Sequence, residues 1–202
     1  VKYLTSIDID DDGDEDIFVE SSGGENISSH FYLSNNDGTF VIDANKDVSP
    51  ASDQYQWLKN ALSESDAKWK IVQHHQPAFT SDENDYGNTW EDARVSTHGD
   101  RRLQEHMVPL YEQFGVDVVF NGHVHFYERT WPVAGDTVVD TGNEGDVHRF
   151  ARGYAPIHLV IGIAGRSAYE ELDEPQPEWS AYRENSTYGW TRLVYDGDSR
   201  CL

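Results

Sequence analysis

Two histidines separated by a single residue, His123 and His125, follow the apolar segment 116–120. That segment is Val or Phe at four of its five positions, which suits a strand buried on both faces, and the Asn-Gly pair that comes next is a turn signal. In extended backbone, side chains two residues apart point to the same side, so we expect both imidazoles to reach one small volume. Imidazole nitrogen is a common transition-metal ligand, and the spacing therefore predicts a metal site.

A second strand of the same design lies upstream. Segment 69–73 is followed by His74, His75 and, two residues later, Pro77. Open α/β sheets build their sites from residues at the carboxyl ends of neighbouring strands. The alternative is that each histidine is a surface or core residue with a hydrogen-bonded ring. Two strands that both end in histidine favour the metal site.

Four segments resemble the calcineurin-like metallophosphoesterases, and in particular their purple acid phosphatase branch. Residues 122–129 are similar to the GHVHxYER signature of that branch, and residues 75–81 to its HxPxYxS segment. Residues 54–58 resemble its Q..WL helix, and residues 188–190 its closing YG strand. These segments stand in the family's order, so residues 43–202 are identified as the C-terminal part of such a domain.

The resemblance implies hydrolysis of a phosphate ester by two transition metals, which are iron, zinc or manganese. Metals about 3.5 to 4 Å apart activate a hydroxide and stabilise the charge on the phosphoryl and leaving oxygens. By resemblance, His75 and His123 bind one metal and His125 binds the other. His98 matches a histidine that contacts the substrate phosphate and protonates the leaving group, a role suited to imidazole.

Neighbouring residues are expected to support this centre. The segment from about residue 80 to 99, which carries His98, is longer than loops usually are unless they have a function. Glu128 and Arg129 are expected to form an ion pair that braces the histidine loop. His74 is expected to point away from His75 and to be structural, because adjacent residues of a strand face opposite ways.

The family's amino-terminal motifs are missing from the sequence. GDxG, GDxxY and GNHE, which carry the bridging aspartate and further ligands, do not occur upstream of Gln54. The chain is therefore a fragment, the product of a truncated reading frame or a degenerate homologue. A metal-binding pseudo-enzyme remains an alternative to an active hydrolase.

The first forty residues contain an acidic loop. Residues 8–16 place carboxylates at relative positions 1, 3, 5 and 9 with glycine at position 6, a spacing that wraps oxygen ligands around calcium. An EF-hand would need glutamate at position 12, where Val19 stands. With predicted strands on both sides and the tail at residues 36–40, residues 1–42 resemble an FG-GAP or VCBS repeat.

That resemblance implies Ca²⁺ binding by the side chains of Asp8, Asp10, Asp12 and Asp16, with the carbonyl of Asp14 as a further ligand. A solvated acidic loop is the alternative. If the loop does bind calcium, the chain could instead be a non-catalytic, calcium-dependent interaction module.

Downstream of residue 43 the predicted elements alternate. A helix is expected from Ser52 or Asp53 to about residue 63, followed by a strand at 69–73, a helix from about residue 100 to 115 and a strand at 116–120. Later strands are expected at 156–163 and 191–195. This order predicts an α/β fold, a layered sheet with flanking helices, preceded by a β-hairpin calcium loop. Whether residues 30–43 belong to the repeat or to the sheet stays open.

The formal charge is −22, from 37 acidic and 15 basic residues. Such a field repels phosphate, which argues against binding nucleic acid or anionic membranes and means that a phosphate-ester substrate needs local attraction by metal cations. The apolar run at 157–164 is far shorter than the roughly 18 residues of a membrane span. Family resemblance implies a secreted, periplasmic or cell-surface protein, and the oligomeric state stays open.

Overall fold

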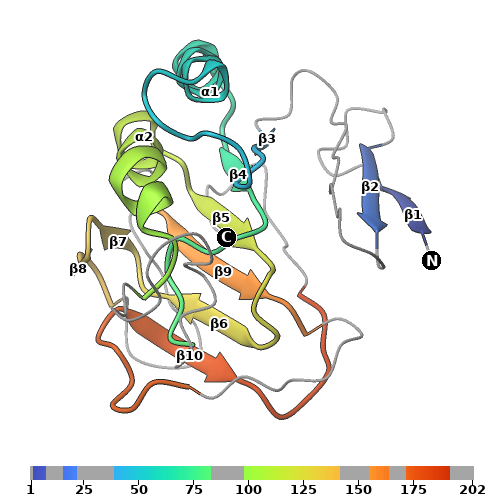
Figure 1. Cartoon of the computed structure of the whole chain (residues 1–202), viewed down its shortest axis with the longest axis vertical. Helices are drawn as coiled ribbons and strands as arrows, with labels where there is room; N and C mark the ends of the chain where they lie inside the picture. The colour runs from blue at the N-terminus through green and yellow to red at the C-terminus, as the bar shows by residue number, and fades with distance from the viewer. Residues whose placement is uncertain are drawn as a thin grey trace.

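The computed structural model describes residues 2–7, 16–21, 39–82, 98–141, 155–163 and 172–191. Its main element is a six-stranded mixed sheet in the order β10-β6-β9-β5-β4-β3 (Figure 1). The parallel strands are β3 (Thr39–Val41), β4 (Ile71–Gln73), β5 (Val118–Asn121) and β9 (Ile157–Ile161). The predicted α/β class is therefore confirmed, and the sheet is mixed.

Two strands add to one edge of the sheet in the antiparallel sense. They are β6 (Tyr127–Thr130), which pairs with β9, and β10 (Ser180–Glu184), which pairs with β6. A separate small ribbon is formed by β7 (Val133–Ala134) and β8 (Thr137–Val138). Strand 156–163 was predicted, whereas the strand expected at 191–195 lies almost wholly outside the described residues.

The N-terminal hairpin consists of β1 (Lys2–Ile7) and β2 (Asp16–Ser21), which pair antiparallel. Strands were predicted on both sides of the acidic loop, and both are present. Of the predicted calcium ligands, Asp8, Asp10, Asp12 and Asp14 lie outside the described residues. Calcium binding therefore stays a prediction.

Strand β3 decides where the sheet begins. Thr39 pairs with Ile71 and Val41 with Gln73 in parallel register, so β3 is the edge strand of the six-stranded sheet. Strand β3 thus lies just upstream of the division predicted after residue 42, within the range 30–43. The sequence left residues 30–43 open because a short strand shows no sign of its partner.

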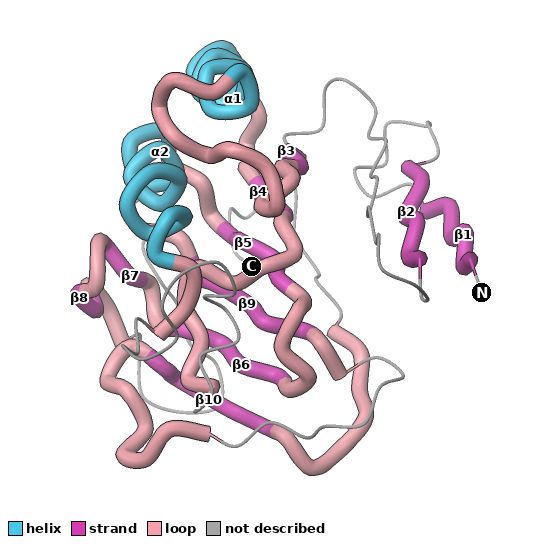
Figure 2. Tube along the Cα trace, in the orientation of Figure 1, coloured by secondary structure: helices cyan, strands magenta, loops and turns pink. Residues whose placement is uncertain are grey.

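Both helices lie beside the β3–β4–β5 half of the sheet (Figure 2). Helix α1 (Asp53–Glu64) begins as predicted, because the Ser52 hydroxyl accepts a hydrogen bond from the Tyr55 amide at 3.2 Å. The second helical segment opens with a π-helical turn, Leu103–Met107, that continues as α2 (Val108–Phe114). It ends at Gly115, whose φ of 67° is left-handed, as the glycine predicted.

The main hydrophobic core fills the space between these helices and the sheet. It joins the buried faces of α1, α2 and strands β3 to β5, including Leu58, Leu62, Val72, Tyr111 and Val119. A smaller cluster lies beside the histidine loop and contains Val124, Phe126, Val160 and Ile163. The site is thus built on a packed frame.

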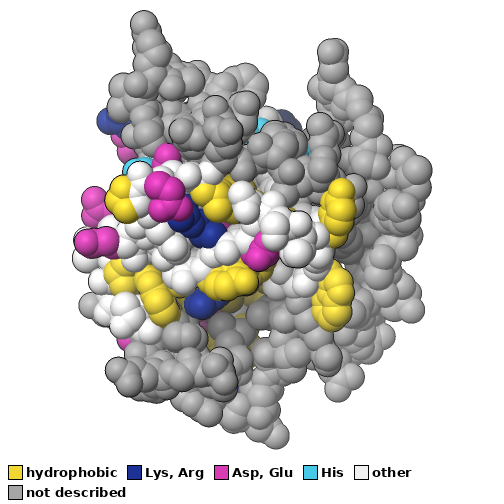
Figure 3. All heavy atoms as spheres, turned by 90° about the horizontal axis from the view of Figure 1, so that it is seen from below, with side chains coloured by type: hydrophobic (Ala, Val, Ile, Leu, Met, Phe, Trp, Pro, Cys, Tyr) yellow, Lys and Arg dark blue, Asp and Glu magenta, His cyan; other side chains and the backbone are white. Residues whose placement is uncertain are grey.

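The surface is mixed in character. On the face seen from below in Figure 1, hydrophobic side chains of the described residues lie in separate spots between charged ones (Figure 3). Among the described residues, the large hydrophobic side chains that are exposed are Trp57, Tyr182, Tyr188 and Trp190. None of the described helices is long and apolar enough to cross a bilayer.

Candidate functional site

His75, His123 and His125 gather where β4 and β5 end. The two strands are parallel, with Gln73 opposite Phe120, so their carboxyl ends meet at one edge of the sheet. The rings of His75 and His123 lie edge to face, with centroids 5.1 Å apart and planes at 82°. His125 is close enough to act on the charge of His75. The structure thus brings the rings of His75 and His123 together with His125 nearby, and these three residues are called here the histidine cluster.

The loop that carries His123 and His125 is not extended, contrary to the sequence-based expectation. Residues 123–126 form bends, and His123 has a left-handed φ of 69°. Gly162, just after β9, makes room for this loop, because a Cβ there would lie 1.9 Å from the Val124 carbonyl oxygen. Close packing against this glycine, and not an alternating strand, places the two rings.

The pKa of His75 is low. Desolvation first, and then the neighbouring His123 and His125, lower the pKa of His75 to about 4. The side chain of His75 nevertheless keeps contact with solvent. At neutral pH it therefore presents an uncharged, accessible imidazole, which is the form that binds a metal ion.

These donors fit the imidazole share of a transition-metal site. Neutral nitrogen ligands suit zinc and iron. Within the described ranges, however, no group of three or more His, Cys, Asp or Glu side chains is arranged so that it could hold an ion by itself. Among the residues that the structure describes, the histidine cluster alone is therefore not a complete metal site, and the motifs GDxG, GDxxY and GNHE are missing from the sequence.

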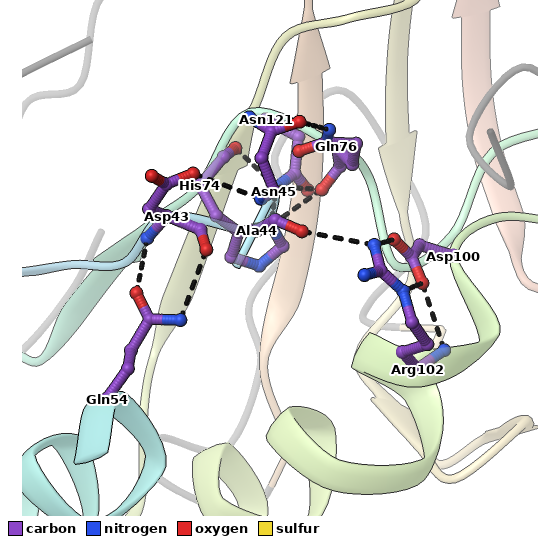
Figure 4. Close-up of polar contacts among 9 residues, drawn as sticks. All are labelled: Asp43, Ala44, Asn45, Gln54, His74, Gln76, Asp100, Arg102 and Asn121. Atoms are coloured by element: carbon purple, nitrogen blue, oxygen red, sulfur yellow. Dashed lines mark hydrogen bonds and ion pairs between the residues drawn. The ribbon is translucent and has the colours of Figure 1, made fainter. Parts of the chain in front are cut away.

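The backbone behind His75 is fixed by buried polar contacts (Figure 4). Asn121, the last residue of β5, donates from Nδ2 to the carbonyl oxygens of His74 at 3.0 Å and of Gln76 at 3.4 Å. His74 is buried and stacks on Tyr111, with ring centroids 6.1 Å apart. Its predicted structural role is borne out by this burial. Asn121 was interpreted only as part of a turn signal, so its side-chain role was missed.

A second polar group joins the start of the π-helical turn to the loop after β3. The buried Asp100 binds Arg102 at 2.6 Å, and Arg102 also donates to the Ala44 carbonyl at 3.0 Å. In the same loop, Asp43 and Gln54 exchange two hydrogen bonds between the Asp43 backbone and the Gln54 side chain. These contacts join helix α1 and the turn at residue 100 to the loop that follows β3 (Figure 4).

The predicted ion pair of Glu128 with Arg129 is wrong. The two are neighbours on β6 and point to opposite faces; Glu128 is fully buried, whereas the Arg129 guanidinium lies 5.6 Å from the centroid of the Trp131 ring. The Glu128 carboxylate instead accepts hydrogen bonds from the Ser81 amide and hydroxyl at 2.9 and 2.6 Å and from the Ser180 hydroxyl at 2.6 Å. Burial raises its pKa against the opposing effect of these bonds and of Arg183.

His98 occupies a special backbone position. Its φ is 53°, and its carbonyl accepts a hydrogen bond from the Thr80 amide at 2.8 Å. The ring nitrogen Nδ1 lies 3.1 Å from Asp173 Oδ2, and the ring meets Trp179 edge-on at 6.1 Å between centroids. Among its contacts with described residues, none is with the histidine cluster.

Open space lies beside His98. A hollow of about 380 Å³ is lined by Phe79, His98, Gln104, Glu105, Gly135, Asp136 and Trp179. The closeness of Asp173 to His98 was not revealed by the sequence, because Asp173 stands 75 positions further along the chain.

Comparison with known proteins gives one consistent result. The family profile described as calcineurin-like phosphoesterase matches residues 2–127, and that of the iron/zinc purple acid phosphatase-like protein C matches residues 155–197. The first match extends over the segment interpreted as an FG-GAP repeat, and neither match supports such a repeat.

Individual relatives agree. Purple acid phosphatase 18 of Arabidopsis thaliana is 34% identical over 69% of this chain and 28% of its own length. A probable inactive purple acid phosphatase 27 from the same plant is 32% identical over 81% of this chain and 26% of its own length. A purple acid phosphatase from yellow lupin seeds has a similar fold, with a TM-score of 0.55 and 23% identity over 73% of this chain and 25% of its own. The chain thus spans well under half the length of these proteins.

Proposed function

Since the chain belongs to the calcineurin-like phosphoesterase family, with purple acid phosphatases among its relatives, we propose that it takes part in the metal-dependent hydrolysis of phosphate esters. The observation that carries this proposal is the meeting of His75 with His123 and His125 at the ends of β4 and β5. Iron and zinc, which the description of the matching family names, are the metals for which we propose the site.

Each histidine has a role in this proposal. His75 and His123 would hold one metal and His125 the second, each through a neutral ring nitrogen. When bound, the metal pair supplies a hydroxide nucleophile and neutralises charge on the phosphoryl oxygens. Because the chain's own charge is −22, these cations would also provide the local attraction that a phosphate ester needs.

His98 is the proposed proton donor to the leaving oxygen. The closeness of Nδ1 to Asp173 Oδ2, at 3.1 Å, and the edge-on contact of the ring with Trp179 support a ring held in place for this role. Since His98 lies apart from the histidine cluster in this structure, the proposal requires that the ester reach from one to the other. The hollow beside His98 supports this by leaving room for the organic part.

A metal-binding protein without turnover is the second candidate. It is favoured by the absence of a complete ligand group in the described ranges and by the lack of the GDxG, GDxxY and GNHE motifs. One of the relatives is itself named as probably inactive.

The proposal is tested by elemental analysis and an aryl phosphate assay on the 202-residue chain, loaded with zinc, iron or manganese. We expect bound transition metal that is lost in His123→Ala and retained in His106→Ala, a matched control from the π-helical turn. Turnover that follows the metal supports the hydrolase, and metal without turnover supports the second candidate. A wild-type chain that takes up no transition metal under any loading condition refutes both.

A further inference from the structure

We propose that Asn121 is a positioning residue that holds His75 in place against His123. The inference rests on the proposed function only in giving these two histidines a metal to bind. Asn121 itself does not touch the ring of His75. It acts on the backbone on either side of that residue.

The side-chain amide of Asn121 forms hydrogen bonds with the backbone carbonyls of both neighbours of His75. Its Nδ2 donates to the carbonyl oxygen of His74 at 3.0 Å and to that of Gln76 at 3.4 Å. His74 Nδ1 lies 2.6 Å from the same Gln76 carbonyl and donates to it. Because the residue before His75 and the residue after it share one buried donor, the backbone at His75 cannot rotate without breaking these bonds.

The carbonyl of His75 is held by the residue next to Asn121. The Gly122 amide donates to the His75 oxygen at 3.0 Å. Three successive carbonyls, at residues 74, 75 and 76, are therefore bound by two successive residues, 121 and 122. Those two residues lead directly into His123, so the same contacts fix both members of the ligand pair.

Residues 74 and 76 are also held by side-chain contacts that do not involve Asn121. Gln76 is buried, and its Nε2 donates to Asn45 Oδ1 at 2.7 Å, while the ring of His74 stacks on Tyr111. With these contacts on one side and Asn121 on the other, the segment 74–76 has one position available. A residue without a donor at 121 would leave the His74 carbonyl without this hydrogen bond and the Gln76 carbonyl with the His74 ring nitrogen as its partner, and would free this segment to shift.

Such support matters because ligand orientation controls metal affinity. Partners that orient a metal ligand typically contribute about 10- to 100-fold to affinity. We therefore expect Asn121→Asp, which has the same shape but places an oxygen against the two carbonyls, to weaken zinc binding by about that factor. Asn60→Asp on the exposed face of α1 is the matched control.

Two measurements on the 202-residue chain test this inference. The first is zinc affinity by competition with a chromophoric chelator. The second, made on the metal-free chain, is the nuclear Overhauser effect between the ring protons of His75 and His123, assigned with His75→Gln. A role in overall stability alone would lower the melting temperature but leave both quantities unchanged in the folded variant.

We expect Asn121→Asp to lose the ring-to-ring effect and to bind zinc more weakly, with Asn60→Asp unchanged in both. A folded Asn121→Asp that keeps the ring-to-ring effect overturns the inference. A wild-type chain that shows this effect but binds none of zinc, iron and manganese refutes the proposed function, and the effect in Asn121→Asp then decides the inference alone. Should Asn121→Asp fail to fold, Asn121→Ala, which removes the side-chain donor without adding charge, is read in its place.

Discussion

Replacing His158 with leucine is expected to stabilise the protein and to reduce its sensitivity to acid. His158 lies on β9, is 1% exposed and has no hydrogen-bond partner on either ring nitrogen among the described residues. Its ring meets Phe79 edge-on, with centroids 4.8 Å apart. A neutral imidazole always carries one N–H, so this residue buries an unsatisfied donor that leucine would remove.

The magnitude at neutral pH follows from that donor. Leaving a buried polar group without a partner costs about 1 to 3 kcal/mol. Leucine is similar in size and suits the apolar contact with Phe79. We therefore expect His158→Leu to be more stable than the wild type at pH 7 by at least about 1 kcal/mol.

The effect grows as the pH falls. Burial, followed by the nearby His74, lowers the pKa of His158 to about 3 in the folded state. The unfolded chain, with a pKa near 6.5, then binds the proton more tightly, so stability is present above pH 6.5 and is lost as the pH falls toward 3. At pH 5, about 1.5 units below the pKa of the unfolded state, protonation in the unfolded chain lowers the free energy of unfolding of the wild type by about 2 kcal/mol. The leucine variant would not lose this stability.

Urea unfolding at pH 7 and pH 5, followed by tryptophan fluorescence, measures both quantities. His106→Leu, at a partly exposed position, serves as the control and should keep the wild-type pH dependence. The wild type also carries His74, whose pKa burial lowers to about 4, so the variant should retain a part of the acid loss. A variant that is less stable than wild type at pH 7, or that loses as much stability at pH 5, would refute this reasoning.

Substitutions at three further places, Glu128, the Arg102–Asp100 ion pair and Gly162, are expected to have defined effects. Glu128→Ala should lower the free energy of unfolding, measured in urea, by about 3 to 5 kcal/mol, because three buried donors lose their acceptor. Glu128→Gln should become more stable relative to the wild type as the pH rises above 4.5, since the raised pKa of Glu128 in the folded state means that its carboxylate form destabilises the fold there. Arg102→Met should lower the free energy of unfolding by about 3 to 5 kcal/mol, because it leaves the buried Asp100 without its cation. Adding Asp100→Asn to this variant should partly restore the stability. Gly162→Ala should fold less stably and weaken zinc binding, because its Cβ would displace the Val124 carbonyl between the two histidines; unchanged affinity in that variant would contradict the packing argument.

Local signals predicted the parts of the fold that local interactions determine. Helix α1 has both its cap at Ser52 and its buried face at Leu58 and Leu62 written in neighbouring residues, and its bounds were predicted closely. Strands β4 and β5 were visible as apolar runs that end in histidine. Strand β6 was missed because the sequence Tyr-Glu-Arg-Thr is polar and becomes a strand only by pairing with β9 and β10.

The same distinction applies to the site. Histidines 75, 123 and 125 were singled out because residue type and strand ends agree with one another, although the extended backbone assumed for the spacing of His123 and His125 is not present. The contacts of Asn121 with His74 and of Glu128 with Ser81 each span 47 residues, so nothing in the surrounding sequence indicated them. The wrong ion pair of Glu128 with Arg129 has the same cause, since adjacency in sequence was taken for adjacency in space.

The parallel register of β4 with β5 also limits when the histidine cluster can form during folding. Ile71 pairs with Val118 and Gln73 with Phe120, and parallel pairing needs the whole intervening crossover to be in place. Closing so long a loop costs entropy before any contact rewards it, which makes such pairing slow. His75 and His123 therefore meet only once β4 and β5 have paired, and a metal that requires both would bind after that pairing.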